Sequence, residues 1–278
     1  MRRIAPGIFL ENEFPALNLG MIVTGEHLLL VGTPIRSEDV RSWLNQSSER
    51  GFPAYTVLLD HHPDWLIGAR DLTMPIVGHT LTSQAIGSMS DSFKGNVHPI
   101  GAETDHLKRV TGISRAIPDL TFSEHMIIRL DGHEIELWHQ PGPTVGSSWV
   151  VDHEREVIFI GDTVTVDEPP YVGDADVEAW LITLDNLRSS RLRTYRIVSA
   201  RDGVIDHSDA TVMARFIRKV QGRIDRLGDS KDPETEIGKV AEELMKGYSI
   251  SRARVNMIRL RLRAGLEDLY RRVYNIEE

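Results

Sequence analysis

Cysteine is absent from this chain of 278 residues. A disulfide framework and a thiolate metal site are therefore excluded, and any metal ion would be held by histidines and carboxylates. Apolar runs long enough to cross a membrane are also missing, and Met1, Arg2 and Arg3 are not followed by the apolar stretch of a signal peptide. We therefore expect a cytoplasmic protein without membrane contacts.

Basic residues are fewer than acidic ones, with 32 Lys and Arg against 41 Asp and Glu. The formal net charge of −9 argues against general binding of nucleic acid. Glycine-rich phosphate-binding motifs are missing, and no base near Ser147 or Ser148 marks a serine nucleophile. Apolar and charged residues make up 41% and 26% of the chain, as in ordinary globular proteins. The length allows one large domain with an extension, or two smaller domains.

One polar cluster follows an apolar run. The stretch Thr56 to Trp65 reads TVLLDHHPDW, and its apolar part predicts the end of a buried strand. Asp60, His62 and Asp64 then lie on the loop that leaves the strand, where α/β sheets usually place their chemistry. Histidine and carboxylate side chains one residue apart can share a cation. A solvated polar turn would give the same letters, so the motif alone leaves both interpretations open.

Short apolar segments separated by turn residues predict many strands and few helices. The predicted strands cover residues 7–10, 17–23, 27–31, 55–59, 74–77, 126–130, 134–138, 147–151, 157–160 and 195–198, and the predicted helices cover 37–49, 82–89 and 176–187. Residues 91–118 carry glycines and prolines among charges. They predict an irregular or partly helical insertion, which forms either a wall of the site or a surface excursion.

The order of these strands, together with the loops PGPTVGS (141–147) and FIGD (159–162), resembles the metallo-β-lactamase superfamily. The resemblance covers about residues 4–220. It implies an α/β fold, the αββα four-layer sandwich, with a metal site along one edge. We expect this domain to span residues 1–225 and a C-terminal helical extension to span residues 226–278.

The first metal-binding loop of that superfamily reads His-x-His-x-Asp-His, and it falls here on Asp60, His62, Asp64 and Trp65. The second loop usually reads Pro-Gly-His-Thr-x-Gly-Ser, but Pro143 stands here in the place of its histidine. Neither proline nor indole offers a side-chain lone pair to a metal. Two ligand positions are therefore lost outright.

Two further ligand positions lie later in the chain. The bridging aspartate of the superfamily matches Asp162, and its final His-Gly matches Asp202-Gly203. The resemblance thus implies a depleted set of metal ligands: Asp60, His62, Asp64, Asp162 and Asp202. Without a cation these carboxylates would repel one another and would need raised pKa values or an arginine partner, for which Arg201 is the candidate.

The remaining ligands divide into two half-sites that share Asp162. Asp60 and His62 complete a site for zinc, iron or manganese, while Asp64 and Asp202 complete an all-oxygen site for a hard ion such as manganese, magnesium or calcium. We expect at most one divalent metal ion. The standard two-zinc centre is predicted not to form, with the indole of Trp65 filling space where a second ion would stand.

Two functions remain open at this stage. The first is a hydrolase of a small ester, thioester or amide, in which one metal ion activates a water molecule that Asp64 orients or deprotonates. The second is a non-catalytic relative that serves as a binding or assembly scaffold, with a small molecule as its ligand. In the scaffold, removal of the Asp162 carboxylate would leave behaviour intact or even raise stability, because it would relieve repulsion.

The last fifty residues predict two helices, one from Pro233 to Met245 and one from Ser249 or Ser251 to Val273. Arginines recur along the second helix. This pattern predicts an amphipathic helix that packs on the main domain and exposes a solvated basic face. In the superfamily, such an extension often shapes the substrate pocket or a dimer interface. We keep both roles open, including a homodimer through these helices.

Overall fold

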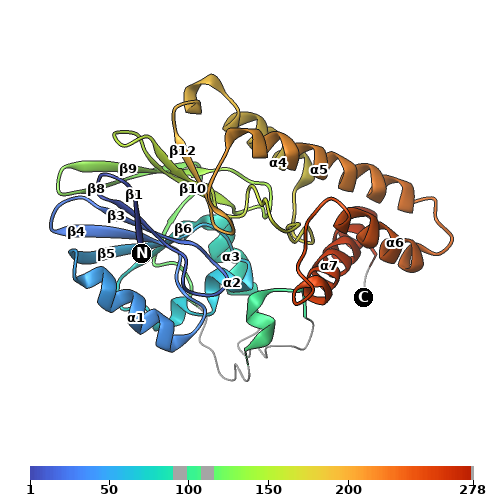
Figure 1. Cartoon of the computed structure of the whole chain (residues 1–278), viewed down its shortest axis with the longest axis horizontal. Coiled ribbons are helices and arrows are strands. Elements are labelled where there is room, and N and C mark those ends of the chain that lie inside the picture. The colour runs from blue at the N-terminus through green and yellow to red at the C-terminus, as the bar shows by residue number, and fades with distance from the viewer. Residues whose placement is uncertain (90–98, 108–115, 277–278) are drawn as a thin grey trace.

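The computed structural model describes residues 1–89, 99–107 and 116–276. Two β-sheets face each other, and helices cover the outer side of each sheet (Figure 1). An apolar cluster fills the space between the sheets with residues such as Leu19, Leu29 and Ile135, all fully buried. The predicted four-layer α/β sandwich with a C-terminal helical part is confirmed.

The first sheet changes from antiparallel to parallel pairing along its width. Its strands are β1 (Arg2–Ala5), β2 (Ile8–Glu11), β3 (Leu19–Val23), β4 (His27–Val31), β5 (Phe52–Leu58), β6 (Ile76–His79) and β7 (Leu120–Phe122), in that order. Pairing is antiparallel up to β4 and parallel beyond it. Helices α1 (Ser37–Ser48) and α3 (Thr80–Ser88) follow β4 and β6. Parallel neighbours need such crossovers, so β4, β5 and β6 end at the same edge.

The second sheet is mainly antiparallel. Its order is β13 (Gly203–Ile205), β12 (Arg196–Ser199), β11 (Val157–Phe159), β10 (Ser148–Asp152), β9 (His133–His139) and β8 (His125–Leu130). The strands β11 and β12 pair in parallel, across helix α4 (Val177–Leu187). Asp131 and Gly132, with φ of 50° and 81°, form the two-residue turn between β8 and β9. Positive φ at both positions suits the twist of a tight hairpin.

Three long helices follow the second sheet: α5 (His207–Leu227), α6 (Pro233–Met245) and α7 (Val255–Tyr274). Their apolar faces share one buried cluster with Trp149 of β10 and Trp180 of α4. The predicted boundary at residue 226 lies inside α5, and the extension shares its core with the sandwich. The division into two domains therefore stays a prediction. Within the described residues, no helix is long and apolar enough to cross a membrane.

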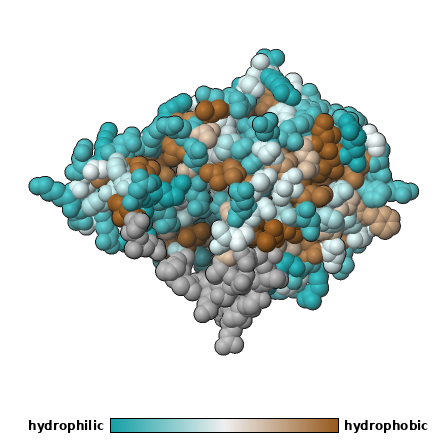
Figure 2. All heavy atoms as spheres, turned by 180° about the vertical axis from the view of Figure 1, so that it is seen from behind, coloured by the Kyte–Doolittle hydropathy of each residue, from teal (hydrophilic) through white to brown (hydrophobic). Residues whose placement is uncertain are grey.

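Short helical turns complete the chain: α2 (Pro63–Leu66), η1 (Ala69–Asp71), η2 (Glu103–His106) and η3 (Ser190–Leu192). One face of the molecule carries hydrophobic residues in separate small groups among hydrophilic ones (Figure 2). Apolar residues scattered in this way are ordinary on a protein surface and need no partner to explain them.

Most predicted strands and helices lie within a few residues of their observed positions. Strands β1, β7 and β13 and helices α2 and α5 were not predicted. The predicted cap of α7 is wrong, because the helix begins at Val255 and Arg254 precedes it without a side-chain cap. Of the predicted insertion, residues 91–98 and 108–115 lie outside the described residues.

Candidate functional site

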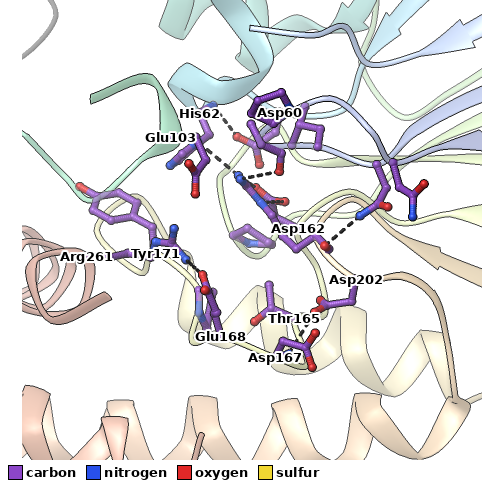
Figure 3. A pocket seen from close by; sticks show the side chains of 18 of the residues that line it. Asp60, His62, Glu103, Asp162, Thr165, Asp167, Glu168, Tyr171, Asp202 and Arg261 are labelled. Carbon is purple, nitrogen blue, oxygen red and sulfur yellow. Dashed lines mark hydrogen bonds and ion pairs between the residues drawn. The ribbon is translucent and has the colours of Figure 1, made fainter. Parts of the chain in front are cut away.

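The loops that follow β5, β11 and β12 surround a cavity of about 540 Å³ at one edge of the sandwich (Figure 3). Backbone hydrogen bonds hold these loops together, from the Ser148 N–H to the Leu59 carbonyl and from the Ala200 N–H to the Gly161 carbonyl. Asp60, His62, Asp162 and Asp202 line this cavity, whereas Asp64 is fully buried behind it. The structure thus brings the five predicted ligand residues to one region.

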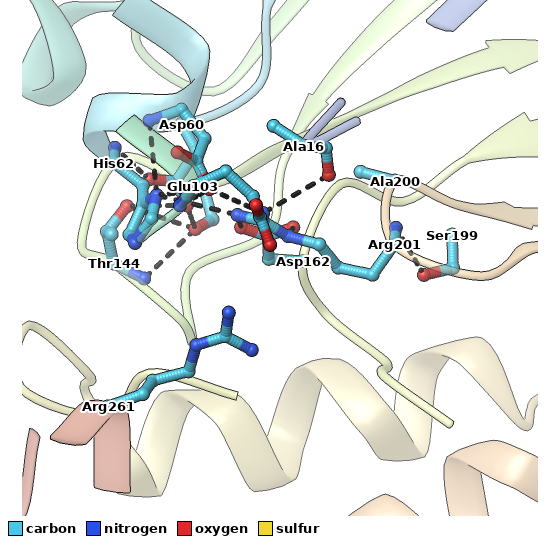
Figure 4. A network of polar contacts seen from close by, with 12 residues as sticks. Ala16, Asp60, His62, Glu103, Thr144, Asp162, Ser199, Ala200, Arg201 and Arg261 are labelled. Atoms are coloured by element: carbon cyan, nitrogen blue, oxygen red, sulfur yellow. Dashed lines mark hydrogen bonds and ion pairs between the residues drawn. The ribbon is translucent and has the colours of Figure 1, made fainter. Parts of the chain in front are cut away.

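The guanidinium of Arg201 lies at the centre of this group. Its Nε and Nη2 each donate to one carboxylate oxygen of Asp162 at 2.8 Å, and its Nη1 donates to Asp64 Oδ2 at 2.7 Å (Figure 4). Nη1 also donates to the Ala16 carbonyl at 3.3 Å, and Nη2 lies 3.4 Å from Nδ1 of His62. These contacts account for all five N–H donors of a guanidinium.

This arrangement keeps both aspartates ionised. Burial by itself raises the pKa of Asp64, but the charge and hydrogen bond of Arg201 outweigh burial and hold that pKa well below its usual range. The Thr104 N–H, 3.0 Å from Asp64 Oδ1, acts in the same direction. Arg201 likewise lowers the pKa of Asp162 against the effect of burial. The prediction that Arg201 pairs with the clustered carboxylates is confirmed.

His62 presents one ring nitrogen to this network and the other to the cavity. Its Nδ1 accepts the Asp64 N–H at 3.3 Å, which caps the first turn of α2, and faces Nη2 of Arg201. Two donors around Nδ1 place the proton on Nε2. Burial lowers the pKa of His62, although Asp64 opposes it, so the imidazole is neutral at pH 7. The ring lies 5.9 Å from that of Tyr171.

Asp60 is held by hydroxyl groups. Its Oδ2 accepts hydrogen bonds from Ser147 Oγ at 2.9 Å and Thr144 Oγ1 at 3.3 Å, and its Oδ1 accepts the His62 N–H at 2.7 Å. Burial raises the pKa of Asp60. Sequence reasoning missed Thr144 and Ser147 as partners, although both belong to the loop that carries Pro143.

Asp202 lines the same cavity but belongs to a different set of bonds. Its carboxylate accepts the N–H groups of Val166 at 2.9 Å and Asp167 at 3.0 Å, and the hydroxyl of Ser199 at 3.4 Å. Burial raises the pKa of this carboxyl. Asp202 therefore organises the loop that follows Asp162 and does not contact the Arg201 guanidinium.

No protein-family model matches the sequence. Among solved structures, the metallo-β-lactamase family protein TTHA1429 from Thermus thermophilus matches 98% of this chain and 95% of its own, with a TM-score of 0.65 and 17% identity. The DIM-1 metallo-β-lactamase matches 78% of this chain and 95% of its own, with a TM-score of 0.61 and 16% identity. The chain has the metallo-β-lactamase fold.

Other relatives agree with this fold and differ in how much of the chain they match. The metallo-β-lactamase from Pontibacter korlensis matches 76% of this chain and 99% of its own, with a TM-score of 0.57 and 16% identity. The greater reach of the Thermus protein, 98% of this chain, indicates that it also resembles the C-terminal helical part. In sequence, hydroxyacylglutathione hydrolase GloC from Haemophilus influenzae is 40% identical over 53 residues, which are 19% of this chain and a quarter (25%) of that protein.

A metal ion, which the metallo-β-lactamase fold implies, does not fit among the residues in this arrangement. The guanidinium of Arg201 contacts His62 Nδ1, Asp64 and Asp162, three of the expected ligands, from the space between them. Across the described residues, no group of three or more histidines and carboxylates is arranged to hold a metal ion. Trp65 is buried in the core cluster, and its ring would lie 3.8 Å from a Cβ added at Gly161, the neighbour of Asp162. That its indole fills the space of a second ion stays a prediction.

The wall opposite these loops comes from η2, α7 and the segment after β11. Arg254 Nη2 lies 2.8 Å from Glu168 Oε2 and 2.7 Å from Glu103 Oε1. Arg261 donates from Nε to the Gly101 carbonyl at 3.0 Å and from Nη1 to Glu168 Oε2 at 3.2 Å. The prediction of a solvated basic face is therefore wrong for Arg261, which is buried, whereas the Arg254 side chain stays partly exposed. Their spacing of seven residues puts them on one side of the helix, a signal that could have identified them.

Proposed function

We propose that this chain is a metal-independent protein of the metallo-β-lactamase fold whose cavity binds a small polar ligand. In this proposal, the guanidinium of Arg201 supplies the positive charge that a metal ion supplies elsewhere. One observation carries the proposal: all five N–H donors of Arg201 are accepted, and three of the accepting residues are the predicted ligands His62, Asp64 and Asp162.

The energetics of this contact favour arginine over a captured ion. A guanidinium presents a planar fork that matches two carboxylate oxygens, and charge-assisted bonds of this kind are strong. Removing one partner from a buried ion pair costs about 3–5 kcal/mol. A metal ion would have to displace Arg201 from two aspartates before it could use their oxygens.

The geometry also disfavours the predicted catalytic role of Asp64. A general base must reach the water molecule that it deprotonates and needs a pKa near the working pH. Asp64 has no exposed surface and does not line the cavity, and Arg201 holds its pKa well below the usual range. The cavity itself, at about 540 Å³, has the volume of an ordinary small-molecule site.

A metal-dependent hydrolase of a small ester, thioester or amide is the second candidate. It is favoured by the relatives, which are named β-lactamases and a hydroxyacylglutathione hydrolase, and by the retained His62, Asp64 and Asp162. In this alternative, Arg201 would have to leave its position to admit the ion.

Metal content separates the two candidates. We expect wild-type protein, purified without added metal and then dialysed against excess zinc, to hold no stoichiometric metal by elemental analysis. Arg201→Ala should instead bind one zinc ion per chain at His62, Asp64 and Asp162. In EDTA this variant should lose about 3–5 kcal/mol of unfolding free energy, part of which zinc should restore.

Arg263→Ala is the matched control, because Arg263 lies on the exposed side of α7 and pairs only with surface carboxylates among the described residues. It should change neither metal uptake nor stability by more than about 0.5 kcal/mol. A chelator-resistant metal ion in the wild-type protein would overturn the proposed function.

A further inference from the structure

The cavity has two chemically different sides. His62, Glu103, Tyr171 and Arg261 lie together on one side, while Thr165, Asp167 and Asp202 lie on the other (Figure 3). The first side carries Arg261 and His62 beside the Glu103 carboxylate, whereas the second carries the Asp167 and Asp202 carboxylates without a basic residue among those labelled. A ligand that fills the cavity therefore meets the Arg261 guanidinium at one end and the carboxylates of Asp167 and Asp202 at the other.

We propose that Arg261 binds an anionic oxygen group of the ligand, a carboxylate or a phosphate, through its Nη2. This inference rests on the proposed function, because it names the class of ligand that the metal-independent cavity accepts. It gives α7 a direct part in binding, which is one of the two roles left open for the C-terminal extension.

Arg261 is a buried cation with unused donors. Its exposed fraction is 8%. Nε donates to the Gly101 carbonyl, and Nη1 donates to Glu168 Oε2 and, at 3.4 Å, to the Pro169 carbonyl. Within the described part of the chain, Nη2 has no hydrogen-bond partner, so two N–H donors of a residue that lines the cavity stay free. Among the described residues, Nη2 is not one of the buried side-chain atoms that lack a partner, so it is accessible from the cavity, where an anionic group can reach it.

The protein compensates the charge of Arg261 only in part. Its carboxylate partner, Glu168, also receives Nε and Nη2 of Arg254, and Nη2 approaches the same Oε2 more closely, at 2.8 Å against 3.2 Å for Arg261. Burial lowers the pKa of Arg261, and the neighbouring charge of Arg201 lowers it further against the weaker opposing effect of Glu168. An anion bound at Nη2 would supply the missing negative charge.

A second free donor lies on the same side. The proton of His62 is on Nε2, and no described residue accepts it. Arg201, in contrast, has no donor left for a ligand. The carboxylates of Asp167 and Asp202 at the other end would repel an anion, so we expect the anionic group of the ligand to lie at the Arg261 end.

Calorimetric titration of the full wild-type chain tests this inference. The titrations use inorganic phosphate and succinate as probes, in EDTA and at constant ionic strength set with sodium chloride. We expect heat of binding with at least one probe, and the preferred probe tells a phosphate site from a carboxylate site. Wild-type protein that binds neither probe would overturn the inference.

Two variants that should change the anion affinity in opposite directions test whether the anion binds at Arg261. Arg261→Gln should weaken binding by about 10- to 100-fold, since it removes a charged donor. Glu168→Gln should strengthen binding, because it removes the competing negative charge. Arg263→Gln on the same helix should leave the affinity unchanged. If Arg261→Gln fails to fold, Glu168→Gln decides, and an unchanged or weaker affinity in that variant contradicts the inference.

The same samples distinguish failure of this inference from failure of the proposed function. Anion binding that disappears in EDTA and returns with zinc would refute the metal-independent cavity. Protein that is free of metal and binds neither phosphate nor succinate would refute only the role of Arg261.

Discussion

Arg201 and Arg261 are two buried arginines on one cavity, and they differ in how the protein uses their donors. Arg201 donates all five N–H groups to protein acceptors, including two carboxylates. Arg261 meets one shared carboxylate and two carbonyls, and its Nη2 has no partner among the described residues. A guanidinium whose donors are all accepted acts as a structural cation, whereas one with free donors can act on a ligand.

The difference follows from where each arginine enters the site. Arg201 follows β12, where loops from both sheets supply acceptors within reach. Arg261 enters from α7, across a cavity that separates it from the ends of these strands (Figure 4). The sandwich thus contributes Arg201, whose charge is neutralised by aspartates, and the C-terminal helices contribute Arg261, whose Nη2 is free among the described residues.

Among these variants, we expect removal of the Asp162 carboxylate to have the largest effect on stability, because it removes a partner of Arg201. The sequence suggested that loss of this carboxylate relieves repulsion, but Asp162 accepts two hydrogen bonds from Arg201 at 2.8 Å. We therefore now expect Asp162→Ala to lower the free energy of unfolding by about 3 kcal/mol, measured by urea denaturation in EDTA. Asp167→Ala, an exposed control, should change it by less than about 0.5 kcal/mol. A higher unfolding midpoint for Asp162→Ala would restore the earlier expectation.

A substitution in α7 tests whether the position of this helix controls anion binding by Arg261. A Cβ on Gly265 would lie 2.9 Å from the backbone nitrogen of Val172, so Gly265→Ala should push the helix outward and cost about 1–3 kcal/mol. It should also weaken anion binding, because Arg261 moves with the helix. Gly238→Ala in α6 is the matched control, since its Cβ would meet nothing within 4 Å and should add up to about 1 kcal/mol. Equal effects of the two variants on binding would contradict a positioning role for α7.

The smallest expected effect concerns Asp60, which has hydroxyl partners and no guanidinium. Burial raises its pKa, so the folded state favours the protonated form. This contribution to stability is fully present below the pKa of the unfolded chain, about 3.9, and is lost as pH rises through the folded pKa. Asp60→Asn cannot titrate. Relative to wild type it should therefore gain stability as pH rises above about 4.

Thermal unfolding of both proteins across this range measures the gain. Asp64 and Asp162 do not interfere, because their lowered pKa values keep both ionised throughout. Their own contribution has the opposite sign and is lost only as pH falls below the unfolded value. A constant difference between Asp60→Asn and wild type would show that Asp60 does not titrate with a raised pKa.

Local patterns were sufficient to predict most strands and the convergence of the polar loops. The hairpin of β8 and β9 follows from alternating apolar residues around Asp131-Gly132, and both signals lie within a few residues of each other. Helix α5 and the inward turn of Arg261 were missed because local patterns do not show what other elements place opposite a helix. A charged residue beside an apolar stripe packs inward or faces solvent according to those elements, here Glu168 and the Gly101 carbonyl.

The sequence by itself determined which side chains could never bind a metal, because Pro143 and Trp65 lack a lone pair in any fold. It also identified the excess of carboxylates that needs a cation, and Arg201 as a candidate to supply it. Only the tertiary structure decided that the guanidinium stands between His62, Asp64 and Asp162, since this position requires loops from both sheets to meet. Which donors remain free for a ligand is likewise a property of contacts between segments far apart in the chain.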